Sequence, residues 1–188
     1  MENYFKNSLV LDSDCYVADY TKSTSSRKGV VISLVPFPDI AYFHLKKRNK
    51  SQSIPYIAVN LEEYCDFIAG TENCECLFSS LRDEGRSWIL FLETKYCGPE
   101  NIERYTFKAH SQMKETLCKL ESMGLVDRSK KRIYFAYSVP GHDERSPFGS
   151  FTFSQNETLQ KLENENIRLL PYNTVVIATP EYLFQPVK

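Results

Sequence analysis

The sequence contains few of the residues from which structural zinc sites are built. It has only three histidines, and its six cysteines include no C-x-x-C pair. A structural zinc ion needs four closely placed Cys or His ligands, so no such site is expected. Cysteines that are scattered singly along a chain suit a reducing compartment, and we therefore expect a cytoplasmic protein.

Excess charge of one sign and long apolar segments are also missing. The formal net charge is -1, so the chain lacks the overall basic field of many nucleic-acid-binding proteins. No stretch indicates a signal peptide or a membrane-spanning helix, and there is no repeat or low-complexity tract. The 188 residues, 42% of them hydrophobic, are sufficient for one globular domain with a real core.

Hydrophobic patterning predicts several strands, a helix, a strand, a helix and a final strand. Residues 1–28 are mixed and polar, and we expect them to form an N-terminal extension to a single domain at 29–188. The order of elements predicts an α/β fold with a mixed central sheet flanked by helices. Strands are expected at 30–35, 40–45, 54–59, 64–69, 74–78, 87–96, 132–139 and 173–179, and helices at 101–123 and 154–166.

The most informative stretch is Trp88–Tyr96, an apolar run that ends with an acid and a base two positions apart. Alternate side chains of a strand point to the same face, so Glu93 and Lys95 should stand side by side at the end of a buried strand. Charges in such a place are expected to pair with each other, a metal ion or a ligand, because an isolated buried charge is costly. The pair is therefore a candidate site.

An acid, any residue and a lysine at the end of an apolar strand resemble the second half of the motif of PD-(D/E)XK nucleases. The first half, an aspartate on a preceding strand, is matched by Asp66. Many members carry a glutamine on the following helix, and Gln112 occupies that place. The resemblance implies a restriction-endonuclease-like core, in which the acidic strands precede a helix, a strand and another helix.

The same resemblance implies a metal-dependent endonuclease that hydrolyses DNA phosphodiester bonds. Asp66 and Glu93 would bind Mg²⁺ or Mn²⁺, with the backbone carbonyl of Thr94 as a further ligand. Glu63 would be the extra upstream acid that some members use, and Glu62 is an alternative. Such a cation prefers a few carboxylates together with water and phosphate oxygens.

The resemblance gives Lys95 and Gln112 roles in the chemistry. Lys95 would orient or deprotonate the attacking water, or stabilise the charge that develops on the phosphate. Gln112 would position water or a backbone phosphate. DNA is the expected partner, and a homodimer or a larger complex would present two active sites to the two strands.

Other interpretations remain open at the level of sequence. Glu93 and Lys95 could form an ordinary surface ion pair worth less than about 1 kcal/mol. Asp39, in a Pro-Asp pair, is a rival for the first acid. The chain could also be a non-catalytic protein that keeps the nuclease-like fold and binds protein or nucleic acid, or an unrelated α/β domain.

Overall fold

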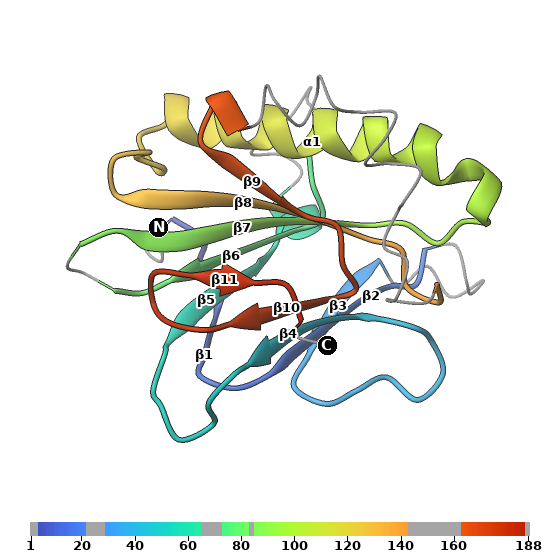
Figure 1. Cartoon of the computed structure of the whole chain (residues 1–188), viewed down its shortest axis with the longest axis horizontal. Helices are drawn as coiled ribbons and strands as arrows, with labels where there is room; N and C mark the ends of the chain where they lie inside the picture. The colour runs from blue at the N-terminus through green and yellow to red at the C-terminus, as the bar shows by residue number, and fades with distance from the viewer. Residues whose placement is uncertain (1–3, 22–28, 65–72, 83–84, 143–162, 187–188) are drawn as a thin grey trace.

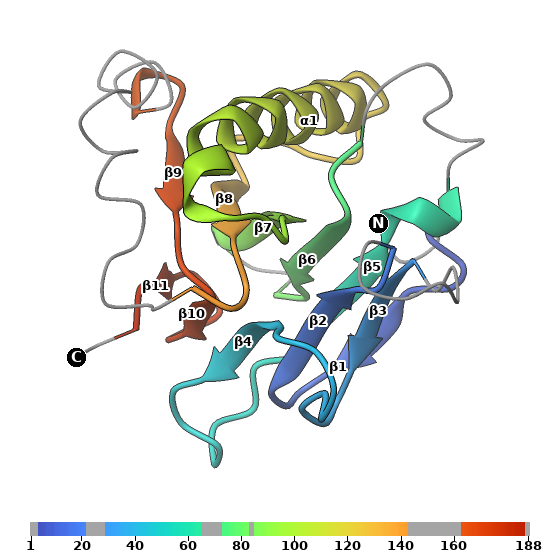
Figure 2. The ribbon, with the colours of Figure 1, turned by 90° about the vertical axis from the view of Figure 1, so that its right-hand side faces the viewer.

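The structure is a computed structural model, and it describes residues 4–21, 29–64, 73–82, 85–142 and 163–186. Two β-sheets and one long helix make up this part of the chain. The helix lies over one face of the larger sheet and the smaller sheet lies against its other face (Figures 1 and 2). The strand predicted at 64–69 and most of the helix predicted at 154–166 fall outside the described residues.

The larger sheet has six strands in the order β1-β5-β6-β7-β8-β9. Neighbouring strands from β1 to β7 are antiparallel, whereas β8 runs parallel to β7 and β9 runs parallel to β8. The mixed sheet predicted from the sequence is thus confirmed. Its strands are Leu9–Leu11 (β1), Tyr56–Asn60 (β5), Cys76–Ser80 (β6), Ser87–Thr94 (β7), Lys131–Ser138 (β8) and Ile167–Leu170 (β9).

The smaller sheet has five strands in the order β11-β10-β4-β2-β3. They are Cys15–Asp19 (β2), Val30–Ser33 (β3), Phe43–Lys47 (β4), Thr174–Ile177 (β10) and Leu183–Phe184 (β11). Two short 3₁₀ helices, Leu61–Tyr64 (η1) and Pro99–Asn101 (η2), complete the described elements. Strands β1 and β2 lie within the segment that we expected to be an extension, so residues 9–19 contribute to both sheets.

The helix Ile102–Ser122 (α1) forms because its apolar side chains recur on one face. Ala109, Met113, Leu117 and Leu120 are all fully buried against the larger sheet, at spacings of four and three residues. The turn after the helix places Gly124 at a φ of +70°, a left-handed conformation that glycine adopts without penalty. The helix thus ends just before Gly124, in agreement with the helix predicted at 101–123.

The two faces of the larger sheet bury two separate cores. Side chains of α1 fill the first, and the second lies between the two sheets around Trp88, Leu90 and Leu92. Every residue of β7 is buried, because this strand lies inside the sheet with a packed layer on each face. A second sheet therefore covers the face on which we had expected helices. Among the described residues α1 is the only α-helix seen in full, and Glu163 and Asn164, within the helix predicted at 154–166, are also helical.

Within the described ranges, no helix combines the length and the apolar character needed to cross a bilayer.

Candidate active site

Two antiparallel strands bring the acid–base pair of β7 next to a third charged residue. Cys76, the first residue of β6, pairs with Leu92 of β7. Because the two strands are antiparallel, Glu75, the residue before β6, lies opposite Glu93. The backbone N–H of Glu75 donates a hydrogen bond to Oε2 of Glu93 over 3.0 Å. The end of β7 and the beginning of β6 thus place two glutamates side by side.

Lys95 completes a carboxylate–lysine cluster, which consists of Glu75, Glu93 and Lys95. Its Nζ forms an ion pair with Oε1 of Glu93 and lies 3.8 Å from Oε1 of Glu75. The Glu93 side chain is 1% exposed and the Lys95 side chain 13% exposed. The predicted neighbourhood of Glu93 and Lys95 is present, and its burial argues against an ordinary surface ion pair.

Thr94, the last residue of β7, lies between Glu93 and Lys95 and holds Glu75 in place. Its backbone N–H donates to Oε2 of Glu75 over 3.0 Å, and its hydroxyl donates to the same oxygen. The side chain that contacts the acid is therefore the middle residue of the E-T-K sequence. The expected role of the Thr94 carbonyl as a metal ligand stays a prediction.

The ionisation of the cluster follows from its burial and its surplus of negative charge. Burial and the nearby Glu93 raise the pKa of Glu75 well above its usual 4.5. Burial also raises the pKa of Glu93, although Lys95 opposes the shift. Burial disfavours the charge on Lys95, but attraction to Glu93 and Glu75 outweighs it and raises the lysine pKa above 10.5. Lys95 is therefore firmly protonated.

The smaller sheet adds a further carboxylate near the cluster. Asp19, the last residue of β2, is 8% exposed, and its charge contributes to the raised pKa values of both glutamates and of the lysine. Its Oδ1 accepts a hydrogen bond from the N–H of Thr21 over 2.8 Å. Its N–H donates to the hydroxyl of Tyr96 over 3.3 Å, just beyond Lys95 in the chain. Asp19 thus adds to the negative potential of the site.

The remaining predicted site residues differ in where they lie. Asp66 falls outside the described residues. Glu63 is exposed on η1 and accepts a 3.5 Å hydrogen bond from Asn60, without a hydrogen bond or ion pair to the cluster among the described residues. Asp39, the rival first acid, accepts a hydrogen bond from the hydroxyl of Tyr20 over 2.8 Å.

Gln112 reaches the cluster indirectly, through the segment that leads into β6. Its Nε2 donates to the carbonyl oxygen of Asn73 over 3.1 Å. Its Oε1 is buried, and the described part of the chain offers it no hydrogen-bond partner. One turn further along α1, the hydroxyl of Thr116 accepts a hydrogen bond from the N–H of Cys74 over 3.0 Å. The helix therefore fixes the backbone immediately before Glu75.

Sequence reasoning missed Glu75 and Asp19 as members of the site. A signal for Glu75 was present, since it lies in the strand predicted at 74–78, which precedes the E-T-K strand in the chain. No local signal marks Asp19, because it reaches the site only when the second sheet packs against the first. Both residues are acidic; Asp19 is the last residue of β2, and Glu75 immediately precedes β6.

The cluster offers few ligands for a metal ion. In the described ranges, no group of three or more His, Cys, Asp or Glu side chains is placed so that it could hold one. Two carboxylates are nonetheless enough for Mg²⁺, which usually takes its remaining ligands from water and substrate phosphate. Glu75 and Glu93, with more negative charge than Lys95 alone can balance, fit this requirement.

No protein-family model matches this chain, and comparisons with curated proteins and with solved structures find no significant similarity.

Proposed function

We propose that this chain is a metal-dependent endonuclease of the PD-(D/E)XK type that hydrolyses phosphodiester bonds in DNA. The observation that carries the proposal is the convergence of Glu75, Glu93 and Lys95 at adjoining strand ends. Glu75 takes the place that the sequence suggested for Asp66. The motif then comprises an acid immediately before β6 and an E-T-K sequence whose first two residues end β7.

The arrangement of elements supports the same proposal. The acid-bearing strands β6 and β7 are followed by helix α1 and then by β8, which lies beside β7 and parallel to it. This is the order of acidic strands, helix and strand that the resemblance to restriction-endonuclease-like proteins implies. Gln112 lies on that helix and hydrogen-bonds to the backbone two residues before Glu75.

The charge of the cluster supports a role for a divalent cation. Two buried carboxylates share one ammonium group, with Asp19 nearby, and the pKa of Glu75 is raised in consequence. Glu75 and Glu93 would hold Mg²⁺ or Mn²⁺, and the Thr94 carbonyl is a further candidate ligand. Bound there, the ion would supply charge neutralisation at the scissile phosphate and lower the pKa of a water molecule.

Lys95 is better suited to stabilise charge than to act as a base. Its raised pKa keeps the side chain protonated, so it can donate hydrogen bonds to a phosphate oxygen but cannot readily accept a proton. In this role it leaves Glu93 free to bind the cation. Gln112 holds the Asn73 carbonyl and thereby the position of Glu75.

A plasmid-nicking assay with Mg²⁺ or Mn²⁺ tests the proposed function. We expect metal-dependent nicking that falls at least about 100-fold in Glu75→Gln, Glu93→Gln and Lys95→Met, since each change removes a ligand or the positive charge at the phosphate. Glu103→Gln, an exposed change in the first turn of α1, is the matched control and should retain activity. Circular dichroism would verify that every variant is folded.

The same assay separates the two candidates for the first acid. If Glu75 is that acid, Asp66→Asn keeps most of the activity and Glu75→Gln loses it. Loss in Asp66→Asn with retention in Glu75→Gln would reverse the assignment. A wild-type protein that neither nicks DNA nor shows a metal-dependent rise in melting temperature would contradict the nuclease.

A non-catalytic binding module is the second candidate. The observation in its favour is that Lys95 already pairs with Glu93 inside a largely buried cluster, so the charges have partners without a metal. In that case Mn²⁺ does not change the melting temperature of the wild type.

If the nuclease is active, we propose that it works as a homodimer or within a larger complex. One cluster per chain attacks one strand, and a second copy related by two-fold symmetry would present its cluster to the other.

A further inference from the structure

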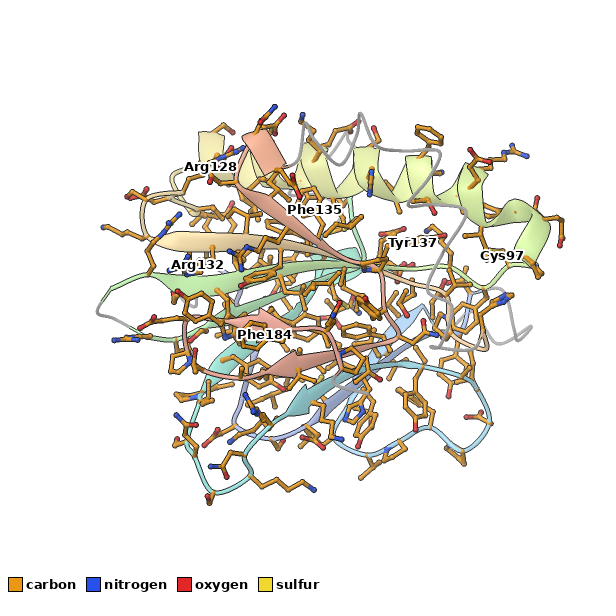
Figure 3. The ribbon with its side chains drawn as sticks, viewed as in Figure 1. Cys97, Arg128, Arg132, Phe135, Tyr137 and Phe184 are labelled. Carbon is orange, nitrogen blue, oxygen red and sulfur yellow. The ribbon has the colours of Figure 1, made fainter. Side chains whose placement is uncertain are left out.

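A basic pocket lies at the other end of β7 and β8 from the carboxylate–lysine cluster. Arg132 pairs with Trp88, whereas Tyr137 pairs with Glu93, five residues further along both strands. At the rise of a β-strand this separation is roughly 17 Å. Figure 3 shows Arg132 and Cys97 at opposite ends of these strands. The pocket is therefore distinct from the candidate active site.

Three arginines from separate parts of the chain line this pocket, which has a volume of about 320 Å³. They are Arg86 before β7, Arg132 on β8 and Arg168 on β9. No carboxylate forms an ion pair with any of them among the described residues. Of the described residues in the lining, Glu163 is the one acidic residue, so these residues carry a surplus of positive charge.

Contacts with Tyr182 fix the position of the Arg132 guanidinium group. One guanidinium nitrogen donates to the hydroxyl of Tyr182 over 2.8 Å, and the guanidinium carbon lies 4.3 Å from the centre of the same ring. Its Nε is buried, and the described part of the chain gives it no hydrogen-bond acceptor. A buried donor without an acceptor is costly. Because Arg132 also lines the pocket, its guanidinium group is placed to donate to the oxygens of a bound phosphate.

A second pocket of about 410 Å³ adjoins the first and shares Arg168, Ile167 and Glu163 with it. Phe184 of β11 lines it and is 45% exposed. The ring of Phe184 is parallel to that of Tyr182, with the centroids 6.2 Å apart. An exposed aromatic ring beside arginines suits a planar base, which gains free energy by stacking.

We propose that these adjoining pockets bind a nucleotide unit, with its phosphate on Arg132, Arg168 and Arg86 and its base against Phe184. The combination of guanidinium groups and an exposed ring matches a phosphate ester that carries an aromatic base. The unit could be a free nucleotide or part of a single strand, and both sources present the same chemistry. The proposal does not depend on the nuclease activity.

Calorimetric titration of the full chain in EDTA tests the proposal while metal binding at the cluster is suppressed. The probes are deoxyadenosine monophosphate, deoxyadenosine, inorganic phosphate and an eight-nucleotide single strand. We expect saturable binding of the monophosphate that is stronger than that of deoxyadenosine or phosphate. If the oligonucleotide binds more tightly than the monophosphate, the natural ligand is a single strand. If the two bind equally per site, the natural ligand is a free nucleotide.

Four variants localise the binding. Arg168→Gln and Phe184→Ala alter exposed side chains and should each weaken monophosphate binding roughly tenfold. Glu163→Gln should strengthen it, because a repelling carboxylate is removed. Arg104→Gln changes an exposed arginine on α1 outside both pockets and should leave the affinity unchanged.

Three results would overturn the proposal. The first is no saturable binding of the monophosphate or the oligonucleotide to the wild type. The second is an equal loss in Arg104→Gln and Arg168→Gln, which would indicate non-specific attraction to positive charge. The third is a combination of two findings: Phe184→Ala binds the monophosphate as tightly as the wild type, and the wild type binds phosphate and monophosphate equally. These findings would show that the base makes no contact with the protein.

Discussion

Three lysines show how this molecule accommodates buried or half-buried positive charge. Lys95 lies between two glutamates, and Lys47, 4% exposed, pairs with Asp12 over 2.6 Å. Lys131 instead donates to neutral oxygens, the hydroxyls of Ser79 and Ser87 among them. Among the ion pairs of the described residues, the Nζ of Lys95 lies within 4 Å of two carboxylates and that of Lys47 within 4 Å of one, and this shared ammonium group distinguishes the candidate active site.

The raised pKa of Glu75 predicts a pH dependence of stability. Glu75 holds its proton more tightly in the folded state than in the unfolded state. Between pH 4.5 and the pKa of Glu75 in the folded protein, the folded state therefore binds more protons than the unfolded state. The contribution of this group to the free energy of unfolding should therefore fall as the pH rises above 4.5, for example between about pH 5 and about pH 8. Urea unfolding at the two pH values measures the change.

Glu75→Gln is the comparison that assigns this effect, because the amide cannot ionise while its oxygen can still accept from Thr94. The fall in stability should be smaller in this variant, and Glu103→Gln should behave like the wild type. Identical pH profiles for wild type and Glu75→Gln would show that the carboxyl is ionised normally in the folded protein.

At the scale of elements, helix α1 connects the core to the candidate site. One face buries Met113 and Leu117 in the first core, and the same helix contacts Asn73 and Cys74 through Gln112 and Thr116. The position of the helix is thus coupled to the position of Glu75. A change at the C-terminal end of the helix should therefore alter both the free energy of unfolding and the position of Glu75.

The turn after α1 gives a prediction about backbone conformation. The N–H of Leu125 donates to the carbonyl of Leu120, and the N–H of Gly124 to that of Glu121, which is the hydrogen-bond pattern of a Schellman motif. Nothing lies within 4 Å of a Cβ at Gly124, so Gly124→Ala meets only backbone strain. We expect it to lower the free energy of unfolding by about 1 kcal/mol, measured by urea denaturation.

Two further substitutions serve as controls for this turn. Gly124→Asn should cost less than alanine, because asparagine tolerates the left-handed conformation better. Gly98→Ala changes a glycine with an ordinary φ of -70°, where only the flexible side chain of Glu100 must move, and should be nearly neutral. An equal loss in Gly98→Ala and Gly124→Ala would contradict the explanation.

At the scale of the whole molecule, Asp12 links the two sheets through hydrogen bonds and an ion pair. It follows β1 of the larger sheet, and its Oδ1 accepts from Nζ of Lys47 in the smaller sheet and from the N–H of Ile54 before β5. Its Oδ2 accepts from the hydroxyl of Ser53. These contacts, chiefly the hydrogen bond from Lys47, lower the pKa of Asp12 to about 2.

Asp12→Asn should destabilise the protein at neutral pH, because it leaves the charge of Lys47 buried without its counter-ion. Asp12 itself is partly exposed, which moderates the cost, and we expect a loss of about 1–3 kcal/mol. The contribution should be present above pH 3.8 and lost as the pH falls through about 2, since Asp12 is then protonated in the folded state. Urea unfolding at pH 7 checks the loss.

Glu103→Gln is again a suitable control for the loss of a carboxylate. Glu103 is exposed on α1 and lies away from the contact between the two sheets. A loss below about 0.3 kcal/mol in Asp12→Asn would show that the link between the sheets carries little free energy.

The sequence by itself determined the elements whose patterns are strong. The apolar run from Trp88 predicted β7, the helical spacing up to Gly124 predicted α1, and alternation predicted β8. Strands β1, β2, β9 and β11 were not predicted, since they are short or polar on one side and are stabilised by neighbours distant in the chain. Leu183 of β11 is 1% exposed, so even this two-residue strand contributes to the core between the sheets.

The acid–base pair of the candidate site was also determined locally. Glu93 and Lys95 lie two residues apart on one strand, so alternation of side chains is enough to bring them together. The tertiary structure alone decided their partners. Glu75 meets Glu93 through the register of β6 and β7, and Asp19 approaches through the packing of the second sheet. Register and packing depend on the free energy of the whole core, which no local pattern of residues contains.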